Sequence, residues 1–314
     1  MPSLPKPKVR FPRGTAAGAA GRGLPPRIPA GSAGGPGGAG TAAPLTPGQV
    51  AQRDMRKRFL IAAIGVYAAG VAGAVYYYSS QGALKPDEFV QPAARDTAET
   101  YENISARYDS MVNREELFMG LSWWRSTVVA EARGDVLEIA CGTGRNVKYL
   151  KPDQVSSVTY VDAAAGMLAQ AEEKYRAEFP GSTKARFVQR RIEDLTPAEG
   201  TYDTILETFG VCSHEDPVAV LSHLQRLLRP GGRILLLEHG RGTWDFINRI
   251  LDKEAARRAE QWGCRWNLDI GGLVRDSGLV VEREDRSHFG TTWTIVARRP
   301  GDEPAPPPPR RWLW

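Results

Sequence analysis

Short apolar runs alternate along most of this chain with longer segments whose apolar positions recur every three or four residues. The apolar runs, typical of buried parallel strands, occupy residues 136–139, 155–161, 185–189, 202–210 and, after a Pro-Gly-Gly turn at 230–232, 233–238. The segments with helical spacing occupy 164–179 and 217–228. Among 314 residues, this pattern predicts one α/β domain of about 200 residues with appendages at both ends.

Three further regions complete the predicted domain. Residues 99–112 and 114–133 have apolar helical faces and precede the first strand, and 279–284 and 291–298 predict a closing hairpin. Between them lies an insertion at 239–278 that contains an amphipathic helix and two tryptophans, Trp262 and Trp266. These two side chains line a substrate surface or form the core of a packed lid, and the sequence leaves both open.

Residues 59–78 contain no charged side chain. As a helix they would extend about 30 Å, the thickness of the hydrocarbon core of a bilayer. Basic residues 56–58 precede the stretch and three tyrosines, 76–78, end it, as expected at membrane interfaces. We therefore expect a single transmembrane helix, with small residues that offer a surface for a partner helix. A linker at 79–94 would join it to the domain at 95–299, and a Pro-rich tail at 300–314 follows.

Charge is distributed unevenly. Residues 1–50 contain no acidic side chain, and residues 1–58 have a net charge of +9, which leaves −4 for the rest of the chain. An acidic domain gives no support for nucleic-acid binding. The N-terminal composition predicts a disordered basic leader and resembles a mitochondrial transit region, with a plain disordered tail as the alternative. With the basic flank before the span, the expected location is the mitochondrial inner membrane, with the domain facing the intermembrane space.

A glycine-containing turn follows the first predicted strand. Gly142 and Gly144 allow backbone conformations and close approaches that a Cβ would hinder, and a helix through residues 146–149 is expected to begin there. Asp162 ends the second strand twenty positions after Gly142, the spacing at which an acid reaches a ribose. The third glycine of a dinucleotide fingerprint is replaced by Val147, so a pyrophosphate ligand is disfavoured.

The pattern Glu138-x-Ala140-x-Gly142-x-Gly144 resembles the acidic-x-Gly-x-Gly-x-Gly motif of class I S-adenosylmethionine-dependent methyltransferases, with alanine at the first glycine. The Pro-Gly-Gly segment at 230–232 is a second hallmark. In order and spacing the motifs resemble the type 11, ubiquinone/menaquinone methyltransferase-like kind, and with leader and span they resemble fungal mitochondrial inner-membrane proteins of that kind. The resemblance implies a Rossmann-like sheet of seven strands, the last antiparallel, with helices on both faces.

The resemblance also implies S-adenosyl-L-methionine as cofactor and a set of binding residues. Carried over position by position, these are Glu138, Ala140, Cys141, Gly142, Thr143, Gly144, Asp162, Ala163, Ile192, Glu193 and Glu207. Arg191 stands where the family usually has an acid, so Glu193 or Asp194 would substitute for it. For Tyr101 and Tyr108, core packing is favoured over contact with the cofactor.

Methyl transfer from a sulfonium depends chiefly on positioning, to which a base can add. His214 and His239, at the mouths of the fourth and fifth strands, are the candidate catalytic bases. The three cysteines are widely separated and imply no metal site and no disulfide framework. The acceptor is expected to be a small molecule or lipid. The alternative is a non-catalytic, membrane-anchored protein that keeps the fold as an interaction platform.

Overall fold

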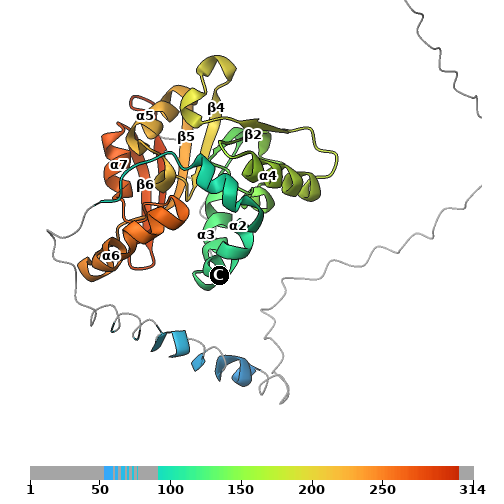
Figure 1. Cartoon of the computed structure of the whole chain (residues 1–314). Coiled ribbons are helices and arrows are strands. Elements are labelled where there is room, and N and C mark those ends of the chain that lie inside the picture. The colour runs from blue at the N-terminus through green and yellow to red at the C-terminus, as the bar shows by residue number, and fades with distance from the viewer. Residues whose placement is uncertain are drawn as a thin grey trace, which may run out of the picture. The chain divides into compact units, whose positions relative to one another are not determined.

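Seven strands form one sheet in this computed structural model, which describes residues 91–303 and scattered residues between 53 and 76. The order is β3-β2-β1-β4-β5-β7-β6, with β1 to β5 parallel and β7 antiparallel to both neighbours (Figure 1). The expected α/β fold with an antiparallel last strand is therefore confirmed. The strands are β1 Gly134–Ile139, β2 Val155–Asp162, β3 Ala185–Gln189, β4 Tyr202–Thr208, β5 Leu228–His239, β6 Val280–Ser287 and β7 Thr292–Arg298.

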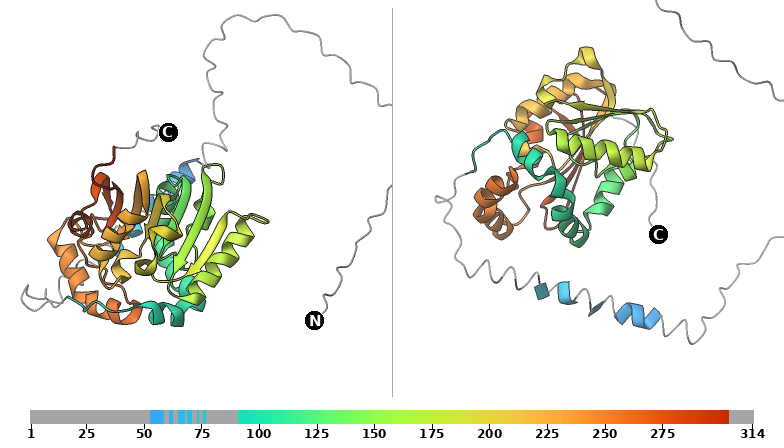
Figure 2. Two further views of the ribbon diagram at one scale, coloured as in Figure 1. Left: turned by 90° about the horizontal axis from the view of Figure 1, so that it is seen from above. Right: turned by 45° about the vertical axis from the view of Figure 1, so that its right-hand side comes forward.

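Helices cover both faces of the sheet (Figure 2). They are α2 Ala98–Phe118, α3 Leu121–Val129, α4 Ala165–Glu178, α5 Pro217–Leu227, α6 Asp245–Trp262 and α7 Ile270–Asp276, with short 3₁₀ turns η1 Val147–Tyr149, η2 Ile192–Asp194, η3 Pro197–Glu199 and η4 Val211–Ser213. Because successive strand residues point to opposite faces, Val136 joins the core with α3 and α4 while Leu137 joins the core with α5 and α7. This alternation explains why the central strands carry apolar residues on both faces.

Two predicted boundaries differ from the structure. The first helix was expected to end near residue 112, but α2 continues to Phe118, and the chain turns at Gly120, whose φ is +63°. Asn113 is compatible with a helix interior, whereas Gly120 adopts the left-handed conformation that ends one. The Pro-Gly-Gly segment lies inside β5 and not before it, at a register shift against β4.

The predicted span at 59–78 falls mostly on residues outside the described part of the chain, as do the leader at 1–50, the linker up to residue 90 and the tail from 304. Among the residues that the structure does describe, no helix is both long enough and apolar enough to cross a membrane.

Candidate active site

The turn after β1 combines three residues with positive φ: Ala140 at +44°, Gly142 at +54° and Gly144 at +73°. The two glycines have different reasons to be there. A Cβ on Gly144 would lie 2.7 Å from the Cα of Ala171 in α4, so this glycine allows the turn to pack against the helix. A Cβ on Gly142 would meet open space, so conformation alone selects glycine there.

The helix predicted through residues 146–149 is absent; the segment forms only the three-residue 3₁₀ turn η1. The amides of Val147 and Tyr149 donate to the carbonyls of Gly144 and Asn146, at 3.2 and 2.9 Å. Asn146 turns its side chain inward, where it is 1% exposed and donates to Glu138 Oε1 at 3.1 Å and to Thr208 Oγ1 at 2.9 Å. These polar partners fix the segment without a helix.

Asp162 ends β2 beside the turn. Its Oδ2 accepts a hydrogen bond from the Gly142 amide at 2.7 Å, and its Oδ1 accepts one from the Ala164 amide at 2.9 Å. Burial raises the pKa of this carboxyl, although the two backbone bonds favour its charged form. Hydroxyl donors from a ligand would add to the stabilisation of the charge at this position.

One pocket, the first pocket, lies at the carboxyl ends of β1, β2 and β4 and encloses about 960 Å³, including its open mouth. This is the usual ligand position in an open α/β sheet. Nine predicted site residues line it: Ala140, Cys141, Gly142, Thr143, Asp162, Ala163, Ile192, Glu193 and His214. Four others, Glu138, Gly144, Glu207 and His239, do not.

Sequence reasoning missed part of the pocket wall. Tyr101 and Tyr108 of α2 pack against a small core cluster, as expected, and they also line the first pocket. Arg191 also lines it and forms an ion pair with Asp96. That pairing explains how an arginine is accommodated where the family usually has an acid. Glu193 lines the pocket and Asp194 does not, which favours Glu193 as the substitute acid.

Residues 91–97, the N-terminal strap, connect the pocket to distant parts of the chain. The Gln91 side chain exchanges hydrogen bonds with that of Asn267, at 3.1 Å each way. Arg95 donates to the Ala259 carbonyl at 2.8 Å, and Thr97 donates to the Ser213 carbonyl at 3.0 Å. Because residues 95–97 line the first pocket, the strap forms one of its walls. No periodicity in the sequence indicated this role.

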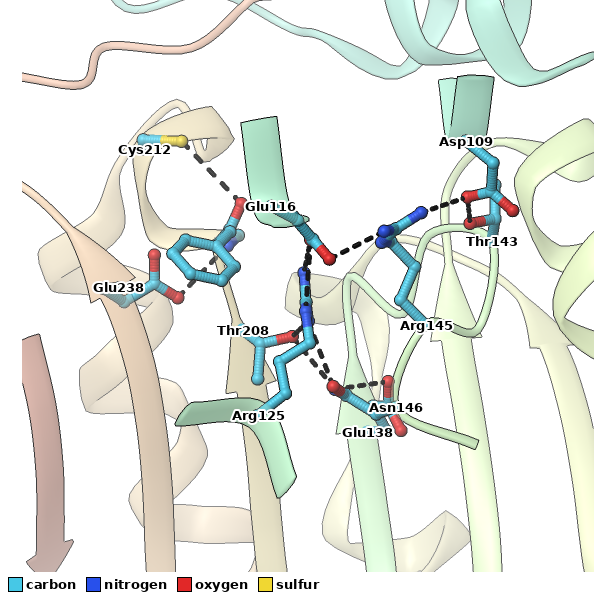
Figure 3. A network of polar contacts seen from close by, with 12 residues as sticks. Asp109, Glu116, Arg125, Glu138, Thr143, Arg145, Asn146, Thr208, Cys212 and Glu238 are labelled. Atoms are coloured by element: carbon cyan, nitrogen blue, oxygen red, sulfur yellow. Dashed lines mark hydrogen bonds and ion pairs between the residues drawn. The ribbon is translucent and has the colours of Figure 1, made fainter. Parts of the chain in front are cut away.

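Glu138 of β1 belongs to a buried polar network behind the pocket (Figure 3). Its side chain is 1% exposed, its Oε1 accepts a hydrogen bond from Asn146, and no described group donates a hydrogen bond to its Oε2. Burial raises the pKa of Glu138 to about 8, because an amide donor does not replace the lost hydration. This first acid of the motif is therefore mainly protonated at neutral pH and holds the turn from within.

Arg125 and Arg145 extend this network (Figure 3). Arg125 donates to Glu116 at 2.7 Å and to Thr208 at 2.7 Å, while Arg145 bridges Glu116 at 2.7 Å and Asp109 at 2.8 Å. Burial opposes ionisation of both carboxyls, but hydrogen bonds from Lys174, Thr143 and Arg145 lower the pKa of Asp109. Arg125 and Arg145 likewise lower the pKa of Glu116. The ion pairs join α2 and α3 to the turn after β1.

His214 lines the first pocket, and its Nε2 lies 2.6 Å from Oε1 of Glu207. Glu207 on β4 is fully buried. Burial lowers the pKa of His214, but the charge of Glu207 and the hydrogen bond outweigh it and raise that pKa above its ordinary 6.5. Glu207 thus contacts His214 and is not among the residues that line this pocket, so its expected contact with the cofactor stays a prediction.

A second pocket of about 590 Å³ adjoins the first and shares Tyr101, Tyr108, Arg125 and Phe209 with it. His239, the other candidate base, lines this second pocket, where its Nε2 lies 3.0 Å from Cys264 Sγ.

The two tryptophans of the insertion have different surroundings. Trp262 lines the second pocket, consistent with a substrate surface. The Trp266 indole donates to the Leu251 carbonyl at 2.8 Å and lies under the Arg258 guanidinium, 4.5 Å from the ring centre. Trp266 is thus a packing residue.

Sequence comparison identifies relatives. Residues 136–232 match the profile of a methyltransferase domain. The chain is 45% identical over 232 residues to "Methyltransferase OMS1, mitochondrial" of Saccharomyces cerevisiae, an alignment that covers 69% of this chain and 49% of that protein. It is 32% identical over 151 residues to the ubiquinone/menaquinone biosynthesis C-methyltransferase UbiE of Bdellovibrio bacteriovorus, covering 45% and 60%. The chain thus spans about half the length of these curated relatives.

Solved structures share the fold. Magnesium protoporphyrin IX methyltransferase from Synechocystis, with bound SAH, superposes with a TM-score of 0.50 at 17% identity, over 65% of this chain and 100% of that one. The cyclase SpnF superposes with a TM-score of 0.52 at 13% identity, over 67% and 97%. A cyclase among the neighbours means that fold alone does not decide the reaction. The matched profile, the 45% identical relative and the motif residues around the first pocket show that this chain contains a class I S-adenosylmethionine-dependent methyltransferase domain.

Proposed function

We propose that the chain is an enzyme that binds S-adenosylmethionine in the first pocket and transfers its methyl group to a small-molecule or lipid acceptor in the second. One observation carries this proposal: the glycine turn, Asp162, Ile192 and His214, far apart in sequence, line one pocket at the switch point of the sheet. Asp162 would accept the ribose hydroxyls, and the backbone at Ile192 and the carboxylate of Glu193 would face the adenine.

The acceptor would lie among the aromatic side chains of the second pocket. Tyr101, Tyr108, Phe209 and Trp262 line it, which suits a flat, largely apolar molecule. Holding such an acceptor in line with the sulfonium lowers the barrier by about 7–11 kcal/mol when the reactants are well oriented.

His214 would act as the general base. Its ring lies in the first pocket, and Glu207 holds its Nε2, as an acid holds the histidine of a catalytic triad. A positioned base contributes about 10²–10⁴-fold in rate. His239 faces the second pocket and is the lesser candidate.

Cofactor binding is tested by calorimetry of the full chain with S-adenosylmethionine and, for comparison, NAD. Asp162→Ala should weaken binding of S-adenosylmethionine about 10- to 150-fold, because it removes charge-assisted hydrogen bonds of about 1.5–3 kcal/mol. Asp153→Ala, an exposed acid outside the pocket, is the matched control. Equal affinity in the two variants, or binding of NAD in place of S-adenosylmethionine, would show that the first pocket is not the proposed S-adenosylmethionine site.

Acceptor binding is tested with Trp262→Ala. Methylation of added phenolic or quinol acceptors, followed as S-adenosylhomocysteine formed, should fall while affinity for S-adenosylmethionine is kept. Trp244→Ala, which removes a tryptophan that is 54% exposed, should change neither. Full-strength cofactor binding with no methylation of any acceptor would favour the alternative, a non-catalytic assembly factor.

We also propose a mitochondrial location with a single membrane span at 59–78 and the domain in the intermembrane space. The acid-free leader, the uncharged stretch and the basic flank at 53–58 support this topology, and the mitochondrial relative from yeast supports the location. Protease added to mitochondria with ruptured outer membranes should digest the domain. Protection until detergent is added would place the domain in the matrix.

A further inference from the structure

Three metal-ligand side chains from distant positions meet at one end of the second pocket. Cys212 lies in η4, His239 ends β5, and Cys264 follows α6. Their ligand atoms all lie within 4.8 Å of one another, and His239 Nε2 and Cys264 Sγ are 3.0 Å apart. The two cysteines are 1% and 5% exposed. Neither the proposed base nor the cofactor residues account for this cluster.

The local backbone holds the two cysteines together. Gly263 ends α6 with a φ of +70°, which turns the chain so that Cys264 enters the pocket. The Arg265 amide then donates to the Cys212 carbonyl at 3.2 Å, which ties the two cysteine segments directly. The cluster is therefore fixed by main-chain geometry as well as by side-chain contact.

Two thiols and an imidazole are the donor set that Zn²⁺ prefers. Zn–S and Zn–N bonds of about 2.3 and 2.0–2.1 Å place tetrahedral ligand atoms roughly 3.5–4 Å apart. The three atoms here need to shift by about 1 Å or less to reach that spacing. Two thiolates would also neutralise the charge of the ion, which suits a buried position.

We propose that Cys212, His239 and Cys264 bind one Zn²⁺ ion, with the fourth coordination position open to the second pocket. All three residues line that pocket, and the structure brings no fourth His, Cys, Asp or Glu ligand to them within its described residues. Three protein ligands with an open position are typical of catalytic zinc sites. The open position would take water or an oxygen, nitrogen or sulfur atom of a ligand in the pocket.

Zn²⁺ binds cysteines as thiolates, so loading of this cluster would release the thiol protons. The proposal does not depend on methyl transfer, since metal content is measured without any methyl acceptor.

The experiment uses the full chain in detergent, stripped of metal by a chelator under reducing conditions and then loaded with Zn²⁺. Elemental analysis should find one zinc per chain. Cys212→Ser and Cys264→Ser should each weaken zinc binding at least about 100-fold, since the loss of an outer-shell partner alone costs 10–100-fold. Cys141→Ser and His288→Gln, which change a cysteine and a histidine outside the cluster, should keep one zinc per chain.

A second measurement needs no variant. Cobalt loaded into the unaltered chain should give tetrahedral ligand-field absorption and thiolate-to-cobalt charge-transfer bands for two sulfurs. The proposal is overturned if the reduced chain takes up no stoichiometric zinc, if cobalt shows no thiolate bands, or if the double variant Cys212→Ser/Cys264→Ser binds zinc as tightly as the unaltered chain. A Cys212–Cys264 disulfide whose reduction does not restore zinc binding would likewise overturn it.

Discussion

The ends of β1 and β4 are built alike but perform different tasks. Each has a buried glutamate, Glu138 or Glu207, and a non-glycine residue with positive φ, Ala140 at +44° or Phe209 at +58°. Glu138 faces an amide and is mainly protonated at neutral pH, whereas Glu207 faces the imidazole of His214. The partner, and not burial, therefore decides whether a buried carboxyl serves the scaffold or the pocket.

The two strand ends differ most in what a side chain would meet at the glycine that follows, Gly142 after β1 and Gly210 after β4. Gly210 has an ordinary φ of −105°, but a Cβ there would lie 2.5 Å from Glu207 Oε1 and 2.9 Å from the Ala140 Cβ. Gly210→Ala should therefore displace Glu207 from His214 and lower the free energy of unfolding by about 4 kcal/mol, combining overpacking with a broken buried pair. Gly142→Ala, with an open Cβ position, should cost only about 1–2 kcal/mol of left-handed strain. Urea unfolding that finds the larger loss in Gly142→Ala would reverse this comparison.

Replacing the β1 carboxyl tests its protonation. The folded-state pKa of Glu138 is about 8 and its ordinary value is 4.5, so the folded protein binds the extra proton between these pH values and loses stability as pH rises through them. Glu138→Gln removes this dependence. Between pH 5 and pH 8 the unaltered chain should lose about 3 kcal/mol more of its free energy of unfolding than the variant does. Parallel pH profiles for the two proteins would show that Glu138 is ionised.

Glu207→Gln tests the β4 carboxyl. It should lower the pKa of His214, followed by NMR, and reduce the free energy of unfolding by about 2 kcal/mol. Because the folded-state pKa of His214 is raised, the stabilisation is complete below pH 6.5 and is lost as pH rises through the folded-state value. The deficit of the variant should therefore shrink at alkaline pH. As the matched control, Glu138→Gln should leave the His214 titration in place.

The smallest effect is expected at Ala140, one of the two strained residues, and Phe209 serves as its contrast. Ala140→Gly should raise the free energy of unfolding by about 0.5–1 kcal/mol, since glycine relieves the left-handed strain at a small entropic cost. Phe209→Gly should lower it, because the ring packs against Arg125 and His239. If thermal unfolding shows that both substitutions stabilise, Phe209 contributes strain without compensating contacts.

Local signals in the sequence predicted the strands and the turn well. The boundaries of β3 match the prediction because an apolar run between polar segments fixes them. The helix α5 begins where its segment was expected to begin, after Asp216, which accepts from the Ala219 amide at 2.9 Å. The short turn η1 was mispredicted as a helix because Asn146 bonds to buried side chains of other elements, namely Glu138 of β1 and Thr208 of β4. Local propensity carries no information about such partners.

The site was predicted where a motif existed and missed where only the fold brings residues together. The turn and Asp162 follow from spacing, but Tyr101, Tyr108 and the strap enter the pocket from a segment with no motif. Cys212, His239 and Cys264 are separated by 27 and 25 residues, which no metal-binding pattern resembles. The cluster forms because β4 and β5 are parallel neighbours, so that the segments after their carboxyl ends lie side by side.

Because the N-terminal strap forms part of the wall of the first pocket, its opening would set how fast a ligand enters and leaves. Its residues 95–97 form part of the first pocket, yet its hydrogen-bond partners, Ala259, Asn267 and Ser213, lie more than a hundred residues further along the chain. A strap held by a few side-chain hydrogen bonds opens far more often than a buried core does. The residence time of a bound molecule would thus depend on how often the strap opens. A domain that begins at residue 98 would keep its core but release its ligand faster.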